Sequence, residues 1–297
     1  MYSKVLLLIS GMLAAVSKGN LLAASNLESN SILNPSQIDE FRNRGILRLR
    51  EFHSSELCNQ LVDAFWNSIG QYGVLRDDQS TWSFTGNPVL EFRPLKNALK
   101  RTNTGLLYTA SLRGLAQVLV GEDELTEWSA QWLITFPHLP SRYPNKVWEV
   151  PRTIWHTDCP RLPESKAPGV VVLNYLSDVE PLGGGTVVIA GSHRLYRDEF
   201  QRVSSRQFKK KLKRHEFFQV LYSKSPDRPA DLRGAKAIVE GVNVEVTELT
   251  GEAGDVVILD GRLLHSITEN LGTTPRLMAR TFFGSRALFE SYAHQTD

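Results

Sequence analysis

The chain has 297 residues, of which 41% are hydrophobic and 22% charged, values that are typical of a folded globular protein. They exclude a disordered chain and a collagen-like repeat, and the presence of only two cysteines excludes a disulfide-held small domain. Lys and Arg (34) nearly balance Asp and Glu (32), so the formal net charge is +2 and gives no support to nucleic-acid binding.

The N-terminal thirty residues differ in composition from the rest. Lys4 precedes an apolar run from Val5 to Val16, and the small residues Ala23-Ala24-Ser25 follow. This order is typical of a secretory signal, and the run is too short for a comfortable membrane span. A helix packed against the domain is the alternative, and the sequence does not decide between them.

We therefore expect an N-terminal apolar segment over residues 1–30 and a single domain over residues 31–297. Cys58 and Cys159 lie far apart in the sequence and form no metal-binding or redox spacing. Two reduced thiols favour a cytoplasmic protein, and a protein routed by its signal-like N-terminus is the alternative. We further expect a monomer with no stable membrane span and no nucleic-acid partner.

Helical signals come first along the chain. Asn34 followed by Pro35 predicts the start of a helix, and Gly45 predicts its end. A short strand is predicted over residues 46–49. A second helix is predicted from apolar residues at helical spacing, namely Leu57, Leu61, Phe65 and Ile69. A polar, irregular stretch over 72–104 precedes a third helix, predicted over 106–120.

Strand-like segments dominate after residue 128. Runs rich in Val, Ile, Thr and aromatic residues alternate there with Gly, Pro and Asp. The runs cover residues 132–136, 169–176, 186–190, 242–246, 255–259 and 277–283. Many short strands predict a β-sandwich or jelly roll. The preceding helices fit an α+β domain, mainly β, with N-terminal helices packed on one sheet.

The segment at about 194–240 interrupts this rhythm, and we expect it to be an insertion between strands. It contains Lys209-Lys210-Lys211 and Lys213-Arg214. Such a run is typical of the solvent-facing side of a helix. A lid, or a contact for an anionic substrate, is the alternative.

The most informative motif is Trp155-His156-Thr157-Asp158. Its flanks predict a strand that ends at a turn. Residues i and i+2 of a strand point to the same side, so His156 and Asp158 would present an imidazole and a carboxylate to one point. Alone, this spacing is weak evidence for a metal site, because many proteins contain it by chance.

A second histidine follows another apolar strand. His265 comes after residues 254–264, and Arg276 begins a further strand-like run. Between them lie the turn-forming residues Glu269-Asn270-Leu271-Gly272. We interpret the whole as a hairpin, in which His265 and Arg276 would lie roughly opposite each other and face one cavity.

Together these residues favour iron chemistry. Two histidines and one aspartate on one face of Fe(II) leave open positions, the pattern of non-haem iron oxygenases. A 2-oxo acid can fill two open positions and dioxygen the third. A guanidinium binds a carboxylate through two parallel hydrogen bonds, so Arg276 is the expected partner of the far carboxylate of 2-oxoglutarate.

The sequence resembles the phytanoyl-CoA dioxygenase-like family of Fe(II)/2-oxoglutarate-dependent oxygenases over roughly residues 33–285. The opening helix-turn-strand, His156-Thr157-Asp158, the segment from Gly183 to Arg194, and the spacing of His265 and Arg276 carry the resemblance. Gly184 and Gly185 stand where the family usually has Gly-Pro, and Ala190 replaces a proline. These changes affect the backbone and not the ligands.

The resemblance implies a double-stranded β-helix (jelly roll, cupin-like) with the metal inside. It implies His156, Asp158 and His265 as metal ligands and catalytic residues, with Fe(II), 2-oxoglutarate and O2 as cofactor and co-substrates, and ascorbate as a helpful additive in vitro. The reaction would oxidise an unactivated C–H bond of a small molecule in specialised metabolism, by hydroxylation, desaturation or oxidative cyclisation, releasing succinate and CO2. Related halogenases lack the carboxylate, so Asp158 favours oxygenation.

Further residues are candidates for the pocket. Asn174, a polar residue in an apolar strand, would either contact 2-oxoglutarate or satisfy core backbone. Thr186 is a similar candidate for binding the co-substrate. Arg280 shares a strand face with Arg276 and is the rival for the co-substrate, or a contact for an acidic substrate. We expect His193 to hold a loop and not a metal. A peptidyl or protein hydroxylase and a catalytically silent ligand-binding β-sandwich are the alternative functions.

Overall fold

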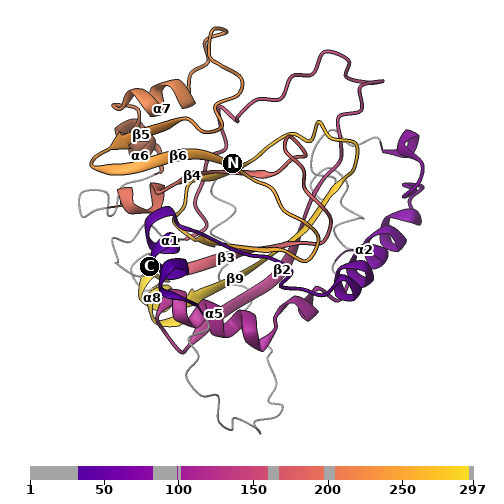
Figure 1. Ribbon diagram of the computed structural model, residues 1–297, viewed down its shortest axis with the longest axis horizontal. Helices are drawn as coiled ribbons and strands as arrows, with labels where there is room; N and C mark the ends of the chain where they lie inside the picture. The colour runs from indigo at the N-terminus through magenta and orange to yellow at the C-terminus, as the bar shows by residue number, and fades with distance from the viewer. Residues whose placement is uncertain (1–32, 83–98, 100–101, 160–166, 197–204, 294–297) are drawn as a thin grey trace, which may run out of the picture. The chain divides into compact units, whose positions relative to one another are not determined.

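Two antiparallel β-sheets face each other and enclose the interior of the domain (Figure 1). The larger sheet has the strand order β1-β7-β3-β9-β2, and the smaller has the order β5-β6-β4-β8. The strands are β1 (Ile46–Leu49), β2 (Leu125–Thr135), β3 (Gly169–Tyr175), β4 (Thr186–Ala190), β5 (Lys236–Val239), β6 (Val242–Leu249), β7 (Val256–Asp260), β8 (His265–Ile267) and β9 (Arg276–Ser285). The predicted jelly roll is confirmed.

The computed structural model describes residues 33–82, 99, 102–159, 167–196 and 205–293. They belong to one unit, which runs from Ile32 to Asp297. The apolar segment predicted over residues 1–30 and part of the irregular stretch over 72–104 lie outside the described residues. Within the described ranges, every helix is too short or too polar to serve as a bilayer span.

Strand β3 shows how the sheets position the interior. All seven of its residues are buried. Val171, Leu173 and Tyr175 point between the two sheets, and Val170 and Val172 point to the helical side. Because neighbouring side chains of a strand point to opposite faces, a strand covered on both faces shows no polar alternation.

Three helices cover the outer face of the larger sheet: α1 (Pro35–Arg44), α2 (Ser55–Gly70) and α5 (Ala110–Val120). The side chain of Asn34 caps α1 in a capping box. Gly45 ends the helix with a φ of 73°, a conformation that glycine adopts without strain. The apolar stripe of α2, with Phe65 at its centre, packs on β2 and β9. The prediction of N-terminal helices packed on one sheet is confirmed.

The segment between β4 and β6 covers the outer face of the smaller sheet. It carries η4 (Ser192–Leu195), α6 (Ser205–Leu212), α7 (Glu216–Leu221) and strand β5. Phe208 and Leu212 of α6 are buried, while the ammonium groups of Lys209 and Lys213 lie 5.6 and 5.8 Å from the ring centre of Tyr222. Lys210, Lys213 and Arg214 are exposed and Lys209 and Lys211 are partly exposed, so the lysine run lies mainly on the solvent-facing side. The remaining elements are η2 (Gln79–Thr81), η3 (Thr104–Leu107) and α8 (Arg286–Ala293).

The predicted hairpin between His265 and Arg276 is wrong. Strand β8, with His265, pairs with β4 in the smaller sheet, whereas β9, with Arg276, pairs with β2 and β3 in the larger sheet. The connection crosses from one sheet to the other, and Asn270 fixes its path by donating to the carbonyls of Thr135 and Thr274. Turn-forming residues permit either path, and this one places the two residues on opposite sheets.

Candidate metal and co-substrate site

His156 and His265 are joined through their backbones. Each donates its N–H to the carbonyl of the other, at 3.0 Å in both directions. Residues that exchange both hydrogen bonds in an antiparallel pair carry their side chains on the same face. The imidazole rings accordingly lie 4.2 Å apart between their centres. Residues around His156 do not form the predicted regular strand, and a single bridge to β8 suffices to position it.

Both rings are oriented by backbone carbonyls. Nδ1 of His156 lies 3.0 Å from the carbonyl of Ile154, and Nδ1 of His265 lies 2.9 Å from the carbonyl of Leu263. A carbonyl can only accept, so each Nδ1 carries a proton, and in the neutral ring each Nε2 presents its lone pair. This is the arrangement by which proteins hold metal-ligating histidines.

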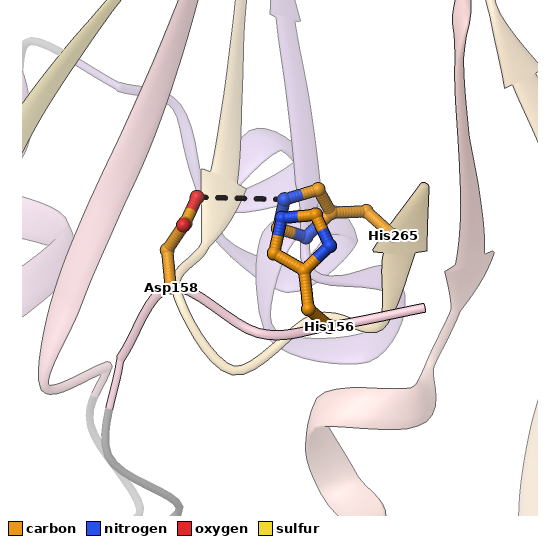
Figure 2. Close-up of side chains that lie close together, drawn as sticks. All are labelled: His156, Asp158 and His265. Atoms are coloured by element: carbon orange, nitrogen blue, oxygen red, sulfur yellow. Dashed lines mark ion pairs between the residues drawn. The ribbon is translucent and has the colours of Figure 1, made fainter. Parts of the chain in front are cut away.

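Asp158 completes the group. Its N–H donates to the carbonyl of Gly261, 2.9 Å away, and that of Cys159 donates to the same oxygen at 2.8 Å. A Cβ at Gly261 would lie 2.0 Å from the Cys159 sulfur, so only glycine permits this approach. One donor atom from each of His156, Asp158 and His265 lies within 4.8 Å of the others (Figure 2). The structure therefore brings the three predicted ligands together, and they could hold one divalent ion.

The three groups titrate differently from free side chains. Burial opposes the charge of Asp158, but the contacts with His265 and the charges of Arg280 and His156 outweigh it and hold the pKa of Asp158 well below its usual value. Burial also opposes the charge of His265, and Asp158 outweighs it, so that the pKa of His265 is raised. The pKa of His156 is lowered, first because protein atoms around its ring remove water and then because of the charge of His265. The residue as a whole is nevertheless exposed.

Ile154 adopts a left-handed backbone conformation two residues before the first histidine. Its φ is 56°, and its side chain is 51% exposed. For a β-branched residue this conformation is an outlier, and such strain costs of order 1–3 kcal/mol. It aims the Ile154 carbonyl at His156, so the backbone is strained where it orients a candidate ligand.

Replacing Ile154 by glycine is expected to stabilise the protein. Glycine adopts a positive φ freely, and relief of the strain should raise the free energy of unfolding by about 1 kcal/mol after the greater chain entropy of glycine is subtracted. Urea denaturation would measure it. Ile238 in β5, 73% exposed, is the matched control, and Ile238→Gly should lower the same quantity by about 0.5–1 kcal/mol. Equal losses in both variants would contradict the claim of strain.

Arg276 lies fully inside the interior. It is 2% exposed, its Nη1 donates to the carbonyl of Gly184, and its Nε has no hydrogen-bond partner. Among the described residues, no carboxylate lies within ion-pair distance of it. Burial lowers its pKa to about 10, with a small opposing contribution from Tyr175. A buried cation without a counter-charge is costly, so this site favours an anionic ligand.

Thr135 lies directly opposite Arg276 on the neighbouring strand. Its hydroxyl is buried and has no hydrogen-bond partner. Gly184, with a φ of 82°, approaches so closely that a Cβ there would lie 3.4 Å from the Thr135 Cβ. Two unsatisfied polar groups, one of them cationic, thus share one end of the interior. Sequence reasoning missed Thr135, because a threonine in a strand is ordinary.

Strands β2 and β9 form the wall beside the metal-binding group. The direct pairs run from Thr135–Arg276 through Gln131–Arg280 to Trp128–Phe282. An irregularity in register between Trp128 and Gln131 keeps both on the inward face, as bulges near binding sites often do. The rings of Trp128 and Phe282 stack with centres 4.4 Å apart. Gln131 is exposed and Trp128 partly so, and this end of the wall is therefore open.

Two further predicted site residues, Thr186 and Asn174, lie on opposite sides of the sheets: one points into the interior and the other points away from it. Thr186 is buried on the inward face of β4, next to the Gly184 turn. Asn174 lies on the helical side of β3: its Oδ1 is 2.8 Å from Nε2 of His53, and its Nδ2 donates to the carbonyl of Ala279. The expectation that Asn174 contacts the co-substrate is contradicted. Both faces of β3 are buried, so the sequence could not show which face is inward.

Arg280, predicted to contact the co-substrate or an acidic substrate, contacts a candidate metal ligand in the structure. Its Nη1 lies 2.8 Å from Oδ1 of Asp158. His193 lies outside the group, with its Nε2 3.0 Å from the carbonyl of Arg42, and it holds a loop to α1 as predicted.

Comparison with known proteins agrees with this architecture. The family model of phytanoyl-CoA dioxygenase (PhyH) matches residues 41–278. No curated protein matches the sequence. Among solved structures, AviO1 from Streptomyces viridochromogenes Tue57 is 17% identical with a TM-score of 0.51, and covers 86% of this chain and 97% of its own.

EctD from S. alaskensis is a second structure with the same fold. In its structure with 2-oxoglutarate and 5-hydroxyectoine it is 18% identical with a TM-score of 0.52, and covers 89% of this chain and 80% of its own. In its structure with bound Fe it is 18% identical with a TM-score of 0.50, and the match covers 88% of this chain and 80% of the EctD chain. These likenesses show the fold, and the match of the family model over most of the sequence shows the family. The chain belongs to the phytanoyl-CoA dioxygenase family.

Proposed function

We propose that the chain is an Fe(II)- and 2-oxoglutarate-dependent dioxygenase that oxidises an unactivated C–H bond of a small molecule and releases succinate and CO2. The observation that carries the proposal is the placement of His156, Asp158 and His265 in the same interior as the unpaired Arg276. A metal site and an anion site in one interior match the two ends of a metal-bound 2-oxo diacid.

The donor set fits ferrous iron. Two imidazole Nε2 atoms and one carboxylate oxygen on one side of an ion leave the opposite positions open. Iron and 2-oxoglutarate, when bound, supply the oxidising chemistry. The protein holds both imidazoles in the required tautomer through the carbonyls of Ile154 and Leu263, and it holds Asp158 through the Gly261 carbonyl.

The Arg276 end fits the far carboxylate of 2-oxoglutarate. The guanidinium can donate to one oxygen through Nε, and the Thr135 hydroxyl, directly opposite on β2, can donate to the other. A bound carboxylate would satisfy both orphaned groups at once. Thr186 lies on the inward face near this end, and we propose it as a lesser contact. The substrate would then enter from the open end of the wall, at Trp128 and Gln131.

Turnover without a known substrate tests the proposal. Purified protein supplied with Fe(II), ascorbate and 2-oxoglutarate is expected to form succinate. Anaerobic addition of 2-oxoglutarate to the Fe(II) protein is expected to produce a new visible absorption band. The absence of both signals would favour a silent ligand-binding jelly roll.

Replacing Thr135 by valine separates binding from stability. Because the Thr135 hydroxyl is unsatisfied without ligand, its removal is expected to leave thermal stability unchanged or higher. The affinity of the metal-loaded protein for 2-oxoglutarate should fall about tenfold, since a hydrogen bond to a charged group contributes about 1.5 kcal/mol or more. Calorimetry and thermal unfolding measure the two effects.

Thr268 provides the matched control for this variant. Its hydroxyl already donates to the carbonyl of Gly185, at 2.6 Å. Thr268→Val should therefore destabilise the protein by about 1 kcal/mol. Loss of stability in Thr135→Val, with unchanged 2-oxoglutarate affinity, would show that Thr135 is structural.

A further inference from the structure

The two oxygens of the Asp158 carboxylate have different surroundings. Oδ1 accepts a hydrogen bond from Nη1 of Arg280 at 2.8 Å. Oδ2 is buried, has no hydrogen-bond partner and lies 3.4 Å from Nε2 of His265. One oxygen is thus taken by a cation, and the other faces the imidazoles.

Arg280 reaches this carboxylate from the inward face of β9 in the larger sheet. The backbone of Asp158 is held by the carbonyl of Gly261, directly after β7 of the same sheet, and the bridge from His156 to β8 links its segment to the smaller sheet. The side chains of Arg280 and Asp158 are 20% and 12% exposed. A guanidinium that is largely removed from water and bonded to a carboxylate fixes the rotation of that carboxylate.

This rotation decides how many positions a metal would keep open. A carboxylate can bind a divalent ion through one oxygen or through both. With six positions on the ion, one oxygen from Asp158 and two imidazoles leave three, enough for a chelating 2-oxo acid and dioxygen. If Asp158 bound through both oxygens, one of those three positions would be lost.

We propose that Arg280 is a positioning residue that holds Oδ1 of Asp158 away from the metal and restricts this ligand to one oxygen. The inference rests on the proposed function, because it requires a metal at the three donors. It replaces the expectation that Arg280 serves an acidic substrate.

Anaerobic titration with Co(II) tests the proposal without substrate turnover. Arg280→Met removes every donor and keeps most of the side-chain volume, and Arg280→Lys restores a cation. Under the proposal, Arg280→Met frees Oδ1 of Asp158 to join Oδ2 on the ion and removes a neighbouring cation, so we expect this variant to bind Co(II) severalfold more tightly than the unaltered protein. We also expect an altered Co(II) d–d absorption spectrum, since the coordination changes, and partial recovery of both properties in Arg280→Lys.

The controls distinguish the possible failures. Arg286, the first residue of α8 directly after this strand, is exposed and paired with Glu124, and it provides the matched Arg286→Ala variant, which should bind Co(II) like the unaltered protein. Unchanged affinity and spectrum in Arg280→Met would overturn the role of Arg280 and leave the proposed function standing. If the unaltered protein bound Co(II) no better than His265→Ala, both the role of Arg280 and the proposed function would be contradicted. Arg280→Gln serves in place of Arg280→Met if the latter does not fold.

Discussion

Replacing His156 or Asp158 by alanine is expected to abolish 2-oxoglutarate-dependent succinate formation. Each variant removes one of three converging donors, and two donors do not fix the geometry of the ion. The metal affinity of the purified variant, measured by calorimetry with Co(II), should fall together with activity. His156 is exposed, so His156→Ala is expected to fold.

His215 provides the control for these variants. It lies outside the site and pairs with Glu240, so His215→Ala should retain both metal binding and succinate formation. Activity retained in both His156→Ala and Asp158→Ala would exclude the metal site as drawn. Loss of activity with unchanged metal affinity would show that these residues act on another step.

Replacing Arg276 by alanine is expected to raise the 2-oxoglutarate requirement steeply. The variant leaves a buried carboxylate of the co-substrate without its cation, and truncating one member of such a pair costs about 2–5 kcal/mol, a loss in affinity of roughly 30-fold or more. Metal affinity should change little, because Arg276 makes no contact with the three donors in the structure. Calorimetric titration of the Co(II)-loaded protein with 2-oxoglutarate measures the loss.

The comparison with Arg280 makes this second prediction sharper. Arg280→Ala should affect metal binding first and raise the 2-oxoglutarate requirement less than Arg276→Ala. Arg276→Lys should recover part of the loss, since an ammonium supplies the charge without the two parallel hydrogen bonds. Equal effects of Arg276→Ala and Arg280→Ala on 2-oxoglutarate affinity would mean that the wrong arginine has been assigned.

The metal-binding group could be predicted from the sequence because its geometry is mostly local. His156 and Asp158 are only two residues apart in the sequence, so their side chains start close together. The fold class could be predicted because many short apolar runs, separated by turn formers, permit few architectures. The position of His265 followed from the resemblance, which the family match supports.

The remaining features depend on contacts between residues that are far apart in the sequence. The residues between His265 and Arg276 permit either a hairpin or a crossing between sheets, and contacts with distant segments distinguish them, namely the pairing of β8 with β4 and the hydrogen bond from Asn270 to the carbonyl of Thr135. The spacing of Arg276 and Arg280 predicts a shared strand face, but it does not show that Arg280 reaches Asp158.

The placement of β8 and β9 in opposite sheets has a consequence for unfolding. His265 belongs to one layer and Arg276 to the other, and a single small molecule held at both would connect the layers through the middle of the barrel. Its binding free energy would then resist their separation directly, and the melting temperature should rise with co-substrate concentration. Under this arrangement the free energy of unfolding would increase with the logarithm of the free co-substrate concentration once that concentration exceeds the dissociation constant.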